Sequence, residues 1–474
     1  MELKGKKILF ARICGTGVSS LAIICKHAGA TVIGTDLEYY PPVSTKLEEE
    51  NIPCYGMEKF SDLARDEKPD LIVVGNALNG KSQEADFIMK CGIPFYSMPS
   101  FMENFLLDGK SPVVISGTHG KTTTTTVFSE VLAGIGKNPS YMIGGIPEFS
   151  GTNAAFSGGE GYFVIEGDEY DTAFFDKGPK FLHYKPETTV VTSIEFDHAD
   201  IYDSVDSIFK NFRKLVEITE KRVILSLDFE YNLKLLEFIP KEKLFTYSVS
   251  DGSADLFVKF VERHGSLMYF SAEFKNGEKY FFETPLFGMQ NLMNLGALVS
   301  FLKCEGFDLK NTEIIENIKN LKGIKRRQEY LGKINGGRIY SDFAHHPTAV
   351  KLTLESFIGF FPEKEINVVF DPATNSNGQN VFEKQYTEIF AEADRIVIGF
   401  PPKAEKFPPE KRFSPERVVE TINSKFPGKA VYIKDIGETI NWVRENSGRD
   451  TVTVVMSNSG FSGFFTKIGQ FFDK

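Results

Sequence analysis

The stretch that decides the fold is VVISGTHGKTTTTT, residues 113–126. An apolar run leads into Gly-Thr-His-Gly-Lys-Thr at 117–122, and the helix-forming segment VFSEVLAGIG follows. In such a strand–turn–helix, glycines let the backbone wrap an anion, and the first N–H groups of the helix face it. The strict phosphate-loop pattern is not met, because Ile115 occupies the position of its first glycine. We nevertheless predict a phosphate-binding loop, since a plain glycine turn with a solvated lysine does not account for several hydroxyls at the helix start.

Two acidic segments each follow an apolar strand: YFVIEGDEYD at 162–171 and TTVVTSIEFDHAD at 188–200. Phosphoryl transfer needs a cation between the phosphates, held by carboxylates opposite the loop. Glu166 ends its strand, where ligands gather in parallel sheets, and His198 could hold a second metal. One such cluster alone is more often a solvated loop, but two of them beside a Lys-Thr loop favour a metal site. The other acidic residues of these segments are Asp168, Glu169, Asp171, Glu195, Asp197 and Asp200.

The composition limits the kinds of function. With 54 Lys and Arg against 64 Asp and Glu, the net charge is −10, which argues against duplex nucleic acid as the main partner but allows a local anion site. The five cysteines form no C-x-x-C pair, which favours reduced thiols in a cytoplasmic protein over a disulfide framework or zinc site. No apolar run of about 18 residues is present, and Arg12 interrupts the apolar N-terminal segment, so we expect neither a membrane span nor a signal peptide.

Short apolar runs alternate with helical stretches along the chain, which predicts an α/β fold of parallel sheets with helices on their faces. KKILFARI and TVIGTD read as strands on either side of the helical segment GVSSLAIICKHAGA. LDGKS near residue 108 is a polar break before the phosphate loop, and a third series of strands begins near Gly323. We therefore expect three domains, at residues 1–108, 109–322 and 323–474.

Five segments together resemble the Mur ligases of peptidoglycan synthesis: GTHGKTT, EGDEYDTAFFDKGPKFLHY, EFDHADIY, DFAHHPTA and MSNSGFSG. The resemblance covers nearly the whole chain, in the same order. It implies a Rossmann-like N-terminal domain for a UDP-sugar, a P-loop ATPase-like central domain for ATP, and a Rossmann-like C-terminal domain that brings the incoming amine. The implied reaction activates the lactyl carboxylate of UDP-N-acetylmuramate as an acyl phosphate, which an amino group then attacks to form an amide. GTDLEYYPPVSTKLEE and VVGNALNG are most similar to the branch that attaches the peptide L-Ala-γ-D-Glu-meso-diaminopimelate in peptidoglycan recycling.

The resemblance also implies site residues, with ATP and Mg²⁺ as cofactors. Lys121, Glu166 and His198 would be catalytic, and Mg²⁺ would lie among Thr122, Glu166 and His198. Taken without the family, Asn291 would be a polar residue on a helix face, and His345 would be a capping or core histidine. The expected ATP-binding residues are Gly117, Thr118, His119, Gly120, Lys121, Thr122, Thr123, Asn291, Asn294, Arg326, Asp342 and His345, and the expected UDP-sugar-binding residues are Gly15, Thr16, Gly17, Asp36, Ser44 and Asn76.

Several positions depart from the family pattern. Arg12 stands where the family has glycine, and it could either block a diphosphate or pair with it. Ser193 replaces an asparagine, and Gln290 replaces a histidine before the asparagine pair. In FDPATNSNGQNVF (370–382), Ala373 stands in place of an arginine that would grip an acidic peptide, and further basic residues are missing. Three functions stay open: a ligase for the murein peptide, a ligase with another acceptor such as L-alanine, and a nucleotide-binding relative that no longer ligates.

Overall fold

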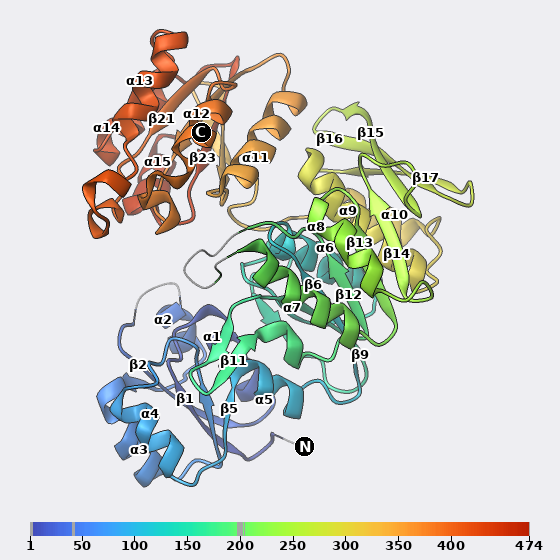
Figure 1. Cartoon of the computed structure of the whole chain (residues 1–474), viewed down its shortest axis with the longest axis vertical. Helices are drawn as coiled ribbons and strands as arrows, with labels where there is room; N and C mark the ends of the chain where they lie inside the picture. Colours follow the sequence, from blue (N-terminus) through green and yellow to red (C-terminus); the bar gives the residue numbers. More distant parts are fainter. Residues whose placement is uncertain (1–2, 40–42, 197–201, 203, 474) are drawn as a thin grey trace. The chain divides into compact units, whose positions relative to one another are not determined.

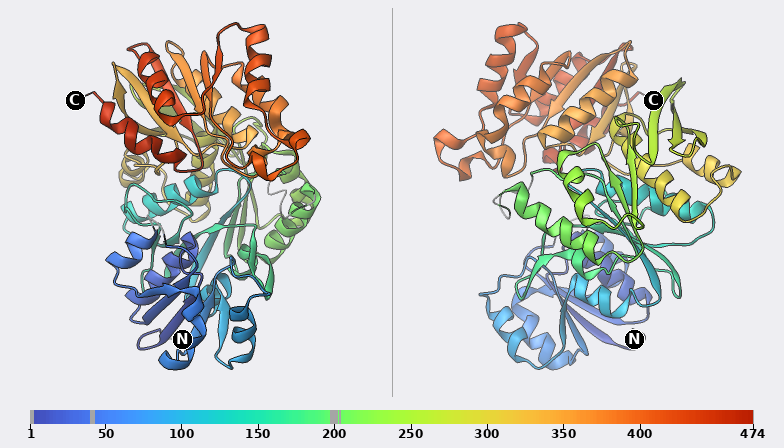
Figure 2. Two further views of the ribbon diagram at one scale, coloured as in Figure 1. Left: turned by 90° about the vertical axis from the view of Figure 1, so that its left-hand side faces the viewer. Right: turned by 45° about the vertical axis from the view of Figure 1, so that its right-hand side comes forward.

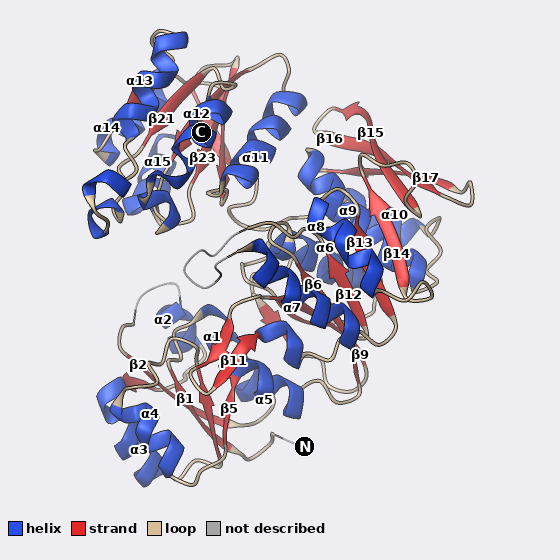
Figure 3. Cartoon of the chain, in the orientation of Figure 1, coloured by secondary structure: helices blue, strands red, loops and turns tan. Residues whose placement is uncertain are grey.

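The computed structural model describes residues 3–39, 43–196, 202 and 204–473 (Figure 1). The chain forms two compact units. The first unit comprises residues 1–259, 271–282 and 293–321, and it holds an N-terminal sheet and most of a central sheet. The second unit comprises residues 260–270, 283–292 and 322–474, and it holds the C-terminal sheet. Figure 3 shows helices and strands alternating through most of the chain.

The N-terminal sheet is parallel, in the order β3-β2-β1-β4-β5. The central strand β1 is apolar and buried, which is typical of a strand covered by helices on both faces. The strand order reverses on the two sides of β1, so the loop from β1 into α1 lies where open α/β sheets bind ligands. The elements are β1 Lys7–Ala11, α1 Thr16–His27, β2 Thr31–Asp36, α2 Val43–Glu49, β3 Cys54–Gly56, η1 Met57–Lys59, α3 Phe60–Glu67, β4 Leu71–Val74, α4 Gln83–Lys90, β5 Phe95–Ser97 and α5 Met98–Phe105.

The central sheet has ten strands, in the order β17-β16-β15-β14-β13-β12-β6-β9-β7-β8. The strands around β6 are parallel and buried, and α6 follows β6 directly. The elements are β6 Lys110–Ser116, α6 Lys121–Gly134, β7 Ser140–Met142, β8 Ala154–Ala155, β9 Gly161–Gly167, η2 Lys180–His183, β12 Thr188–Val191, α7 Val205–Ile218, β13 Arg222–Ser226, α8 Glu230–Leu235, η3 Leu236–Phe238, β14 Leu244–Ser248, β15 Leu256–His264, β16 Leu267–Phe274, β17 Lys279–Thr284, α9 Met289–Cys304 and α10 Thr312–Lys319.

The C-terminal sheet runs β18-β19-β23-β20-β21-β22, and all of its pairs are parallel except β18 with β19. Helices cover both of its faces (Figure 2). The elements are β18 Glu329–Ile334, β19 Gly337–Asp342, α11 Pro347–Phe360, β20 Glu365–Phe370, η4 Ser376–Gly378, η5 Asn380–Phe382, α12 Glu383–Phe390, β21 Arg395–Ile398, η6 Ala404–Lys406, η7 Pro409–Lys411, α13 Pro415–Lys425, β22 Ala430–Tyr432, α14 Ile436–Glu445, β23 Thr451–Met456, η8 Phe461–Gly463, α15 Phe464–Ile468 and η9 Gly469–Phe471.

A hairpin of the central region, β10 Asp171–Ala173 and β11 Asp176–Pro179, packs on the N-terminal sheet. Phe175, at its tip, meets Phe95 edge to face, with ring centroids 4.9 Å apart. Asp176 accepts a hydrogen bond from the Ser97 hydroxyl at 2.9 Å. The hairpin thus closes one edge of the N-terminal core with residues that come much later in the chain.

The α/β fold with three mainly parallel sheets agrees with the prediction, whereas the residue limits 1–108, 109–322 and 323–474 stay a prediction. Two details differ. The apolar strand of segment 188–200 ends at Val191, four residues before the first acidic residue, and β15 to β17, which extend the central sheet, were not foreseen. All five cysteines are free thiols, as expected. Among the described residues, no helix has both the length and the apolar character that a membrane crossing requires.

Candidate active site

The loop between β6 and α6 requires glycine at its first position. Gly117 has a φ of +142°, and a Cβ there would lie 2.1 Å from the Thr192 hydroxyl oxygen. Gly120 has a φ of +83°, which is also the region that favours glycine, and it precedes the first residue of α6. The end of β12 therefore sits against this loop, and the first N–H groups of α6 point toward the space above it.

The Lys121 ammonium is held inside the loop. It donates to both carboxylate oxygens of Glu169, at 3.0 and 3.2 Å, and to the Gly117 carbonyl at 2.6 Å. Burial alone would lower the pKa of Lys121, but the nearby carboxylates of Glu169, Asp168 and Glu166 outweigh burial and raise it. The lysine is thus firmly charged, which suits a phosphate ligand.

Thr122 and Glu166 come together at the ends of α6 and β9. The Thr122 hydroxyl donates to Glu166 Oε1 at 2.9 Å, and the Gly144 N–H donates to Glu166 Oε2 at 2.6 Å. Burial raises the pKa of the Glu166 carboxyl above its usual value. A hydroxyl and a carboxylate are the hard oxygen donors that Mg²⁺ prefers, so this pair fits a magnesium ion.

The third expected metal ligand, His198, lies outside the described residues, as do Asp197 and Asp200. Within the part of the chain that the structure describes, no group of three His, Cys, Asp or Glu side chains could hold a metal. The metal assignment therefore rests on Thr122 and Glu166 and remains a prediction for His198.

The threonine run has a structural explanation. Thr125 and Thr126 donate their hydroxyls to the carbonyls of Lys121 and Thr122 one turn earlier, both at 2.8 Å. Thr124 donates to Asn294 Oδ1 at 3.0 Å. The run itself is therefore not a sign of an anion, which corrects the reasoning from sequence. It does bring Asn294 of α9, an expected ATP-binding residue, to the start of α6.

Ser193 supports the phosphate loop from the neighbouring segment. Its hydroxyl accepts a hydrogen bond from the His119 N–H at 2.9 Å, and its carbonyl accepts one from the Thr118 N–H at 2.8 Å. The His119 ring lies 3.0 Å from the Glu195 carboxylate. The replacement of asparagine by serine thus leaves the loop anchored.

In the second unit, three residues are joined by hydrogen bonds through the side chain and the backbone N–H of the middle one. Asn291 Nδ2 donates to Gln328 Oε1 at 2.9 Å, and the Gln328 N–H donates to Asp342 Oδ2 at 2.8 Å. Burial raises the pKa of Asp342. Asn291 and Asp342 were expected near the nucleotide, but Gln328, which joins them, was not foreseen.

Arg326 and Asp371 hold the segment that follows β23. The Arg326 guanidinium donates to the carbonyls of Ser457 and Ser459, and both serine hydroxyls donate to Asp371 Oδ2, at 2.7 and 2.6 Å. The MSNSG segment is thus fixed between Arg326 and the start of segment 370–382.

The variant segment 370–382 is tied to the histidine loop. Asn377 Nδ2 and the Tyr386 hydroxyl both donate to the His345 carbonyl, the former at 3.1 Å, and Tyr386 also donates to Asn377 Oδ1 at 2.8 Å. The His345 ring nitrogen Nδ1 lies 3.0 Å from the Phe343 carbonyl. Ala373, which belongs to the same segment, is buried. Neutral side chains therefore order a segment in which basic residues were expected.

In the N-terminal sheet, Asp36 organises the loop after β1. Its Oδ2 accepts from the Cys14 N–H and its Oδ1 from the Leu37 N–H, both at 2.7 Å. Arg12 NH1 lies 2.9 Å from Asp36 Oδ1, without the alignment of a hydrogen bond. The φ of Arg12 is +65°, a conformation that favours glycine. Arg12 thus neutralises Asp36 at a position whose backbone suits glycine.

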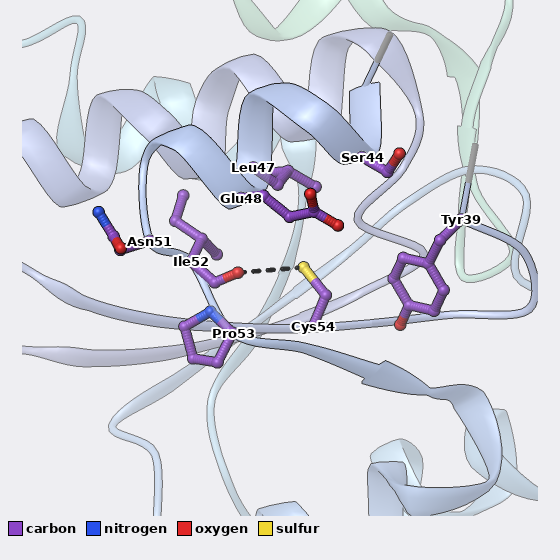
Figure 4. Close-up of a pocket in the computed structure, with 8 residues that line it drawn as sticks. All are labelled: Tyr39, Ser44, Leu47, Glu48, Asn51, Ile52, Pro53 and Cys54. Carbon is purple, nitrogen blue, oxygen red and sulfur yellow. Dashed lines mark hydrogen bonds between the residues drawn. The ribbon is translucent and has the colours of Figure 1, made fainter. Parts of the chain in front are cut away.

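The remaining residues expected to bind the UDP-sugar belong to the start of α1, to α2 and to the segment after β4. Gly15 and Thr16 are exposed at the start of α1, and a Cβ on Gly17 would lie 3.0 Å from the Met98 sulfur. Asn76 is exposed just after β4. Ser44 lines a cavity of about 470 Å³ beside α2 (Figure 4). The cavity is lined by Tyr39, Ser44, Leu47, Glu48, Asn51, Ile52, Pro53 and Cys54.

Three family models match the chain: Mur ligase family, catalytic domain over residues 7–109, Mur ligase middle domain over 115–301, and Mur ligase, glutamate ligase domain over 326–459. A UDP-N-acetylmuramate–L-alanyl-γ-D-glutamyl-meso-2,6-diaminoheptandioate ligase of Haemophilus influenzae is 30% identical over 98% of both chains. The chain belongs to the Mur ligase family. Mur ligases are ATP-dependent enzymes that form amide bonds, and this chain is such a ligase.

Two further Mur ligases show how the similarity extends. A UDP-N-acetylmuramate–L-alanine ligase of Desulfitobacterium hafniense is 30% identical over 83% of this chain and 84% of the relative. The crystal structure of a murein peptide ligase from Psychrobacter arcticus aligns with a TM-score of 0.69 and 26% identity, covering 98% of each chain. The similarity to the murein peptide ligases thus spans all three domains of this Mur ligase.

Sequence reasoning missed some partners in this Mur ligase. Glu169 was one of several acidic residues, and nothing marked it as the partner of Lys121. No sequence motif marked Gly144 as a neighbour of Glu166. A Cβ on Gly144 would lie 2.8 Å from Glu166 Oε1. The repeated glycines in MIGGIP were the available hint that backbone approaches a ligand closely at this point.

Proposed function

We propose that this Mur ligase joins UDP-N-acetylmuramate to the peptide L-alanyl-γ-D-glutamyl-meso-diaminopimelate, as a recycling step of peptidoglycan metabolism in the cytoplasm, where UDP-sugar precursors are handled. The observation that carries the proposal is the convergence of Lys121, Thr122 and Glu166 at the ends of β6 and β9. The choice of acceptor is supported by the murein peptide ligase of H. influenzae, which this chain resembles over nearly its whole length.

The residues of the site can each be given a task. Gly117 to Thr123 would wrap the ATP phosphates with backbone N–H groups, and Lys121 would exchange Glu169 for phosphate oxygens. Mg²⁺, held by Thr122 and Glu166, with His198 as a further proposed ligand, would neutralise charge between the phosphates. The lactyl carboxylate oxygen attacks the γ-phosphorus, so that an acyl phosphate forms and ADP leaves. The peptide amine then attacks the acyl carbon, which forms the amide, releases phosphate and gives up a proton.

A second acceptor, L-alanine, is favoured by one specific observation. Segment 370–382 contains neither lysine nor arginine: its one charged residue is Asp371, and hydrogen bonds of Asn377 and Tyr386 order it. An acceptor without a side-chain carboxylate needs no cation here. The L-alanine ligase of D. hafniense is also 30% identical, over a smaller share of the chain.

The test is phosphate release from ATP and Mg²⁺ in the presence of UDP-N-acetylmuramate, with the tripeptide or L-alanine added separately. Release that depends on the tripeptide supports the proposal. Release with L-alanine alone moves the enzyme to the second acceptor. Release with neither, while wild-type protein still binds ATP, rejects both acceptors. Phosphate release without UDP-N-acetylmuramate is the control, because it measures any contaminating ATPase.

A further inference from the structure

Lys46, on α2, is a cation without a matching anion. Its Nζ donates to Asn153 Oδ1 at 3.3 Å, and no described carboxylate lies within ion-pair distance of it. The side chain is half-buried, and burial lowers its pKa, with Glu50, just after the helix, and Glu49 opposing this only at longer range. A partly desolvated ammonium that makes one long bond to a neutral amide is poorly compensated.

The position of Lys46 links the two halves of the reaction site. Asn153, its partner, accepts a hydrogen bond through its carbonyl from the Ile143 N–H at 2.9 Å. The next residue, Gly144, donates its N–H to Glu166 Oε2 at 2.6 Å. Lys46 is therefore connected to Glu166, the expected magnesium ligand, through Asn153 and the Ile143–Gly144 peptide.

The loop expected to hold the sugar nucleotide borders the same place. α2 packs beside α1 (Figure 1), and α1 in turn contacts β8, the strand that begins just after Asn153. A Cβ on Gly17, at the start of α1, would lie 3.7 Å from the Met142 methyl carbon, at the end of β7. Lys46 thus lies on the helix beside α1, and its partner Asn153 precedes the strand that α1 also contacts.

Charge explains why a cation is needed there. The lactyl carboxylate has to approach a site already lined by Glu166 and Glu169, and the Lys121 ammonium has to serve the phosphates. Like charges that share a site repel one another strongly when they are partly buried. A point charge on a flexible stem, such as lysine, can follow a carboxylate that is to be moved toward the γ-phosphate.

We propose that the Lys46 ammonium binds the lactyl carboxylate of UDP-N-acetylmuramate and positions it beside Thr122 and Glu166. This inference rests on the proposed function, because it takes the sugar nucleotide from there. Lys46 thereby becomes a specificity residue: it distinguishes a muramyl nucleotide from one whose sugar lacks the lactyl ether.

The experiment compares two sugar nucleotides by titration calorimetry without ATP. UDP-N-acetylmuramate carries the carboxylate, and UDP-N-acetylglucosamine shares the rest of the ligand without it. Lys46→Met is expected to raise the Kd for UDP-N-acetylmuramate about tenfold to a hundredfold, the range for a lost charged hydrogen bond, and to leave that for UDP-N-acetylglucosamine within about twofold. Lys46→Arg keeps the charge and should recover most of the preference.

The matched control is Lys90→Met, which removes an exposed lysine on another helix of the N-terminal domain, α4, whose Nζ lies 2.6 Å from Asp86. It should change neither Kd. Equal losses for both nucleotides in Lys46→Met, or no loss for either, would overturn the assignment. If Lys46→Met does not fold, Lys46→Gln replaces it in the same comparison. Failure of wild-type protein to bind either nucleotide would reject both this inference and the proposed function, whereas binding without acceptor-dependent phosphate release would reject the proposed function alone.

Discussion

The buried pair of Lys121 and Glu169 leads to a prediction about stability and nucleotide binding. Glu169→Gln keeps the shape of the side chain but removes its charge. The two charged groups lie 3.0 Å apart, with only 13% and 3% of their side chains exposed. At an effective dielectric constant of about 20, their attraction is about 5.5 kcal/mol. A glutamine oxygen still accepts one hydrogen bond, and Asp168 and Glu166 remain, so we expect a loss of about 3 kcal/mol in the free energy of unfolding.

This loss should appear in thermal unfolding. For domains of this size, 1 kcal/mol corresponds to about 2–4 °C, so the melting temperature of Glu169→Gln should fall by about 6–12 °C without nucleotide. A non-hydrolysable ATP analogue with Mg²⁺ would supply negative charge to the unpaired Lys121. The deficit should therefore shrink when the analogue is saturating.

Scanning fluorimetry with and without the analogue provides the measurement, with Asp171→Asn as the control. Asp171 pairs with Lys177 at 2.9 Å on an exposed surface, with 45% and 67% of the two side chains exposed, so its loss should cost less than about 1 kcal/mol. The reasoning is refuted if Glu169→Gln melts like the control, or if its deficit is the same with and without the analogue.

Four further predictions follow from the structure. Lys121→Ala should abolish turnover while UDP-N-acetylmuramate still binds; retained turnover would disprove the phosphate-loop assignment. Gly117→Ala should lower the free energy of unfolding by at least about 3 kcal/mol and weaken ATP binding, because the new Cβ would lie 2.1 Å from Thr192 Oγ1. Calorimetry of unfolding and nucleotide titration measure these two effects. Ala373→Arg should lower the KM for the tripeptide and, since Ala373 is only 7% exposed, also lower the melting temperature; an unchanged KM would argue against a missing cation. Glu273 has a pKa lowered to about 2 by Lys279 and Lys259, so its stabilisation is present above about pH 4.5 and is lost as the pH falls toward 2; Glu273→Gln should therefore match wild type in urea melts near pH 2 and be slightly less stable, by under about 1 kcal/mol, at pH 7.

The strand, the glycine turn and the helix that begins at Lys121 could be predicted because they are contiguous in the chain. The partner of Lys121 could not. Asp168, Glu169 and Asp171 follow the same strand, and the choice among them depends on the register of β9 on β6, in which Glu166 lies opposite Ile115. Register between distant strands leaves no local trace in the sequence.

The part of the central sheet from β15 to β17 escaped prediction for another reason. Much of β15 is exposed, so its alternation of apolar and polar residues is weak. The Asn276-Gly277 pair, in which Gly277 has a φ of +88°, was the available hairpin signal. Gln328 had no comparable signal, because its role depends on bringing Asn291 and Asp342 to its two sides.

The β10–β11 hairpin limits how this enzyme can be taken apart. Phe175 and Asp176 belong by sequence to the nucleotide-binding part, yet they complete the packing around Phe95 and Ser97. A fragment that ends near residue 108 would expose this apolar edge and leave the Ser97 hydroxyl without its carboxylate. Exchange of sugar-nucleotide modules between related ligases should therefore succeed only when the hairpin is exchanged together with the sheet that it covers, so the two parts have to evolve as one piece.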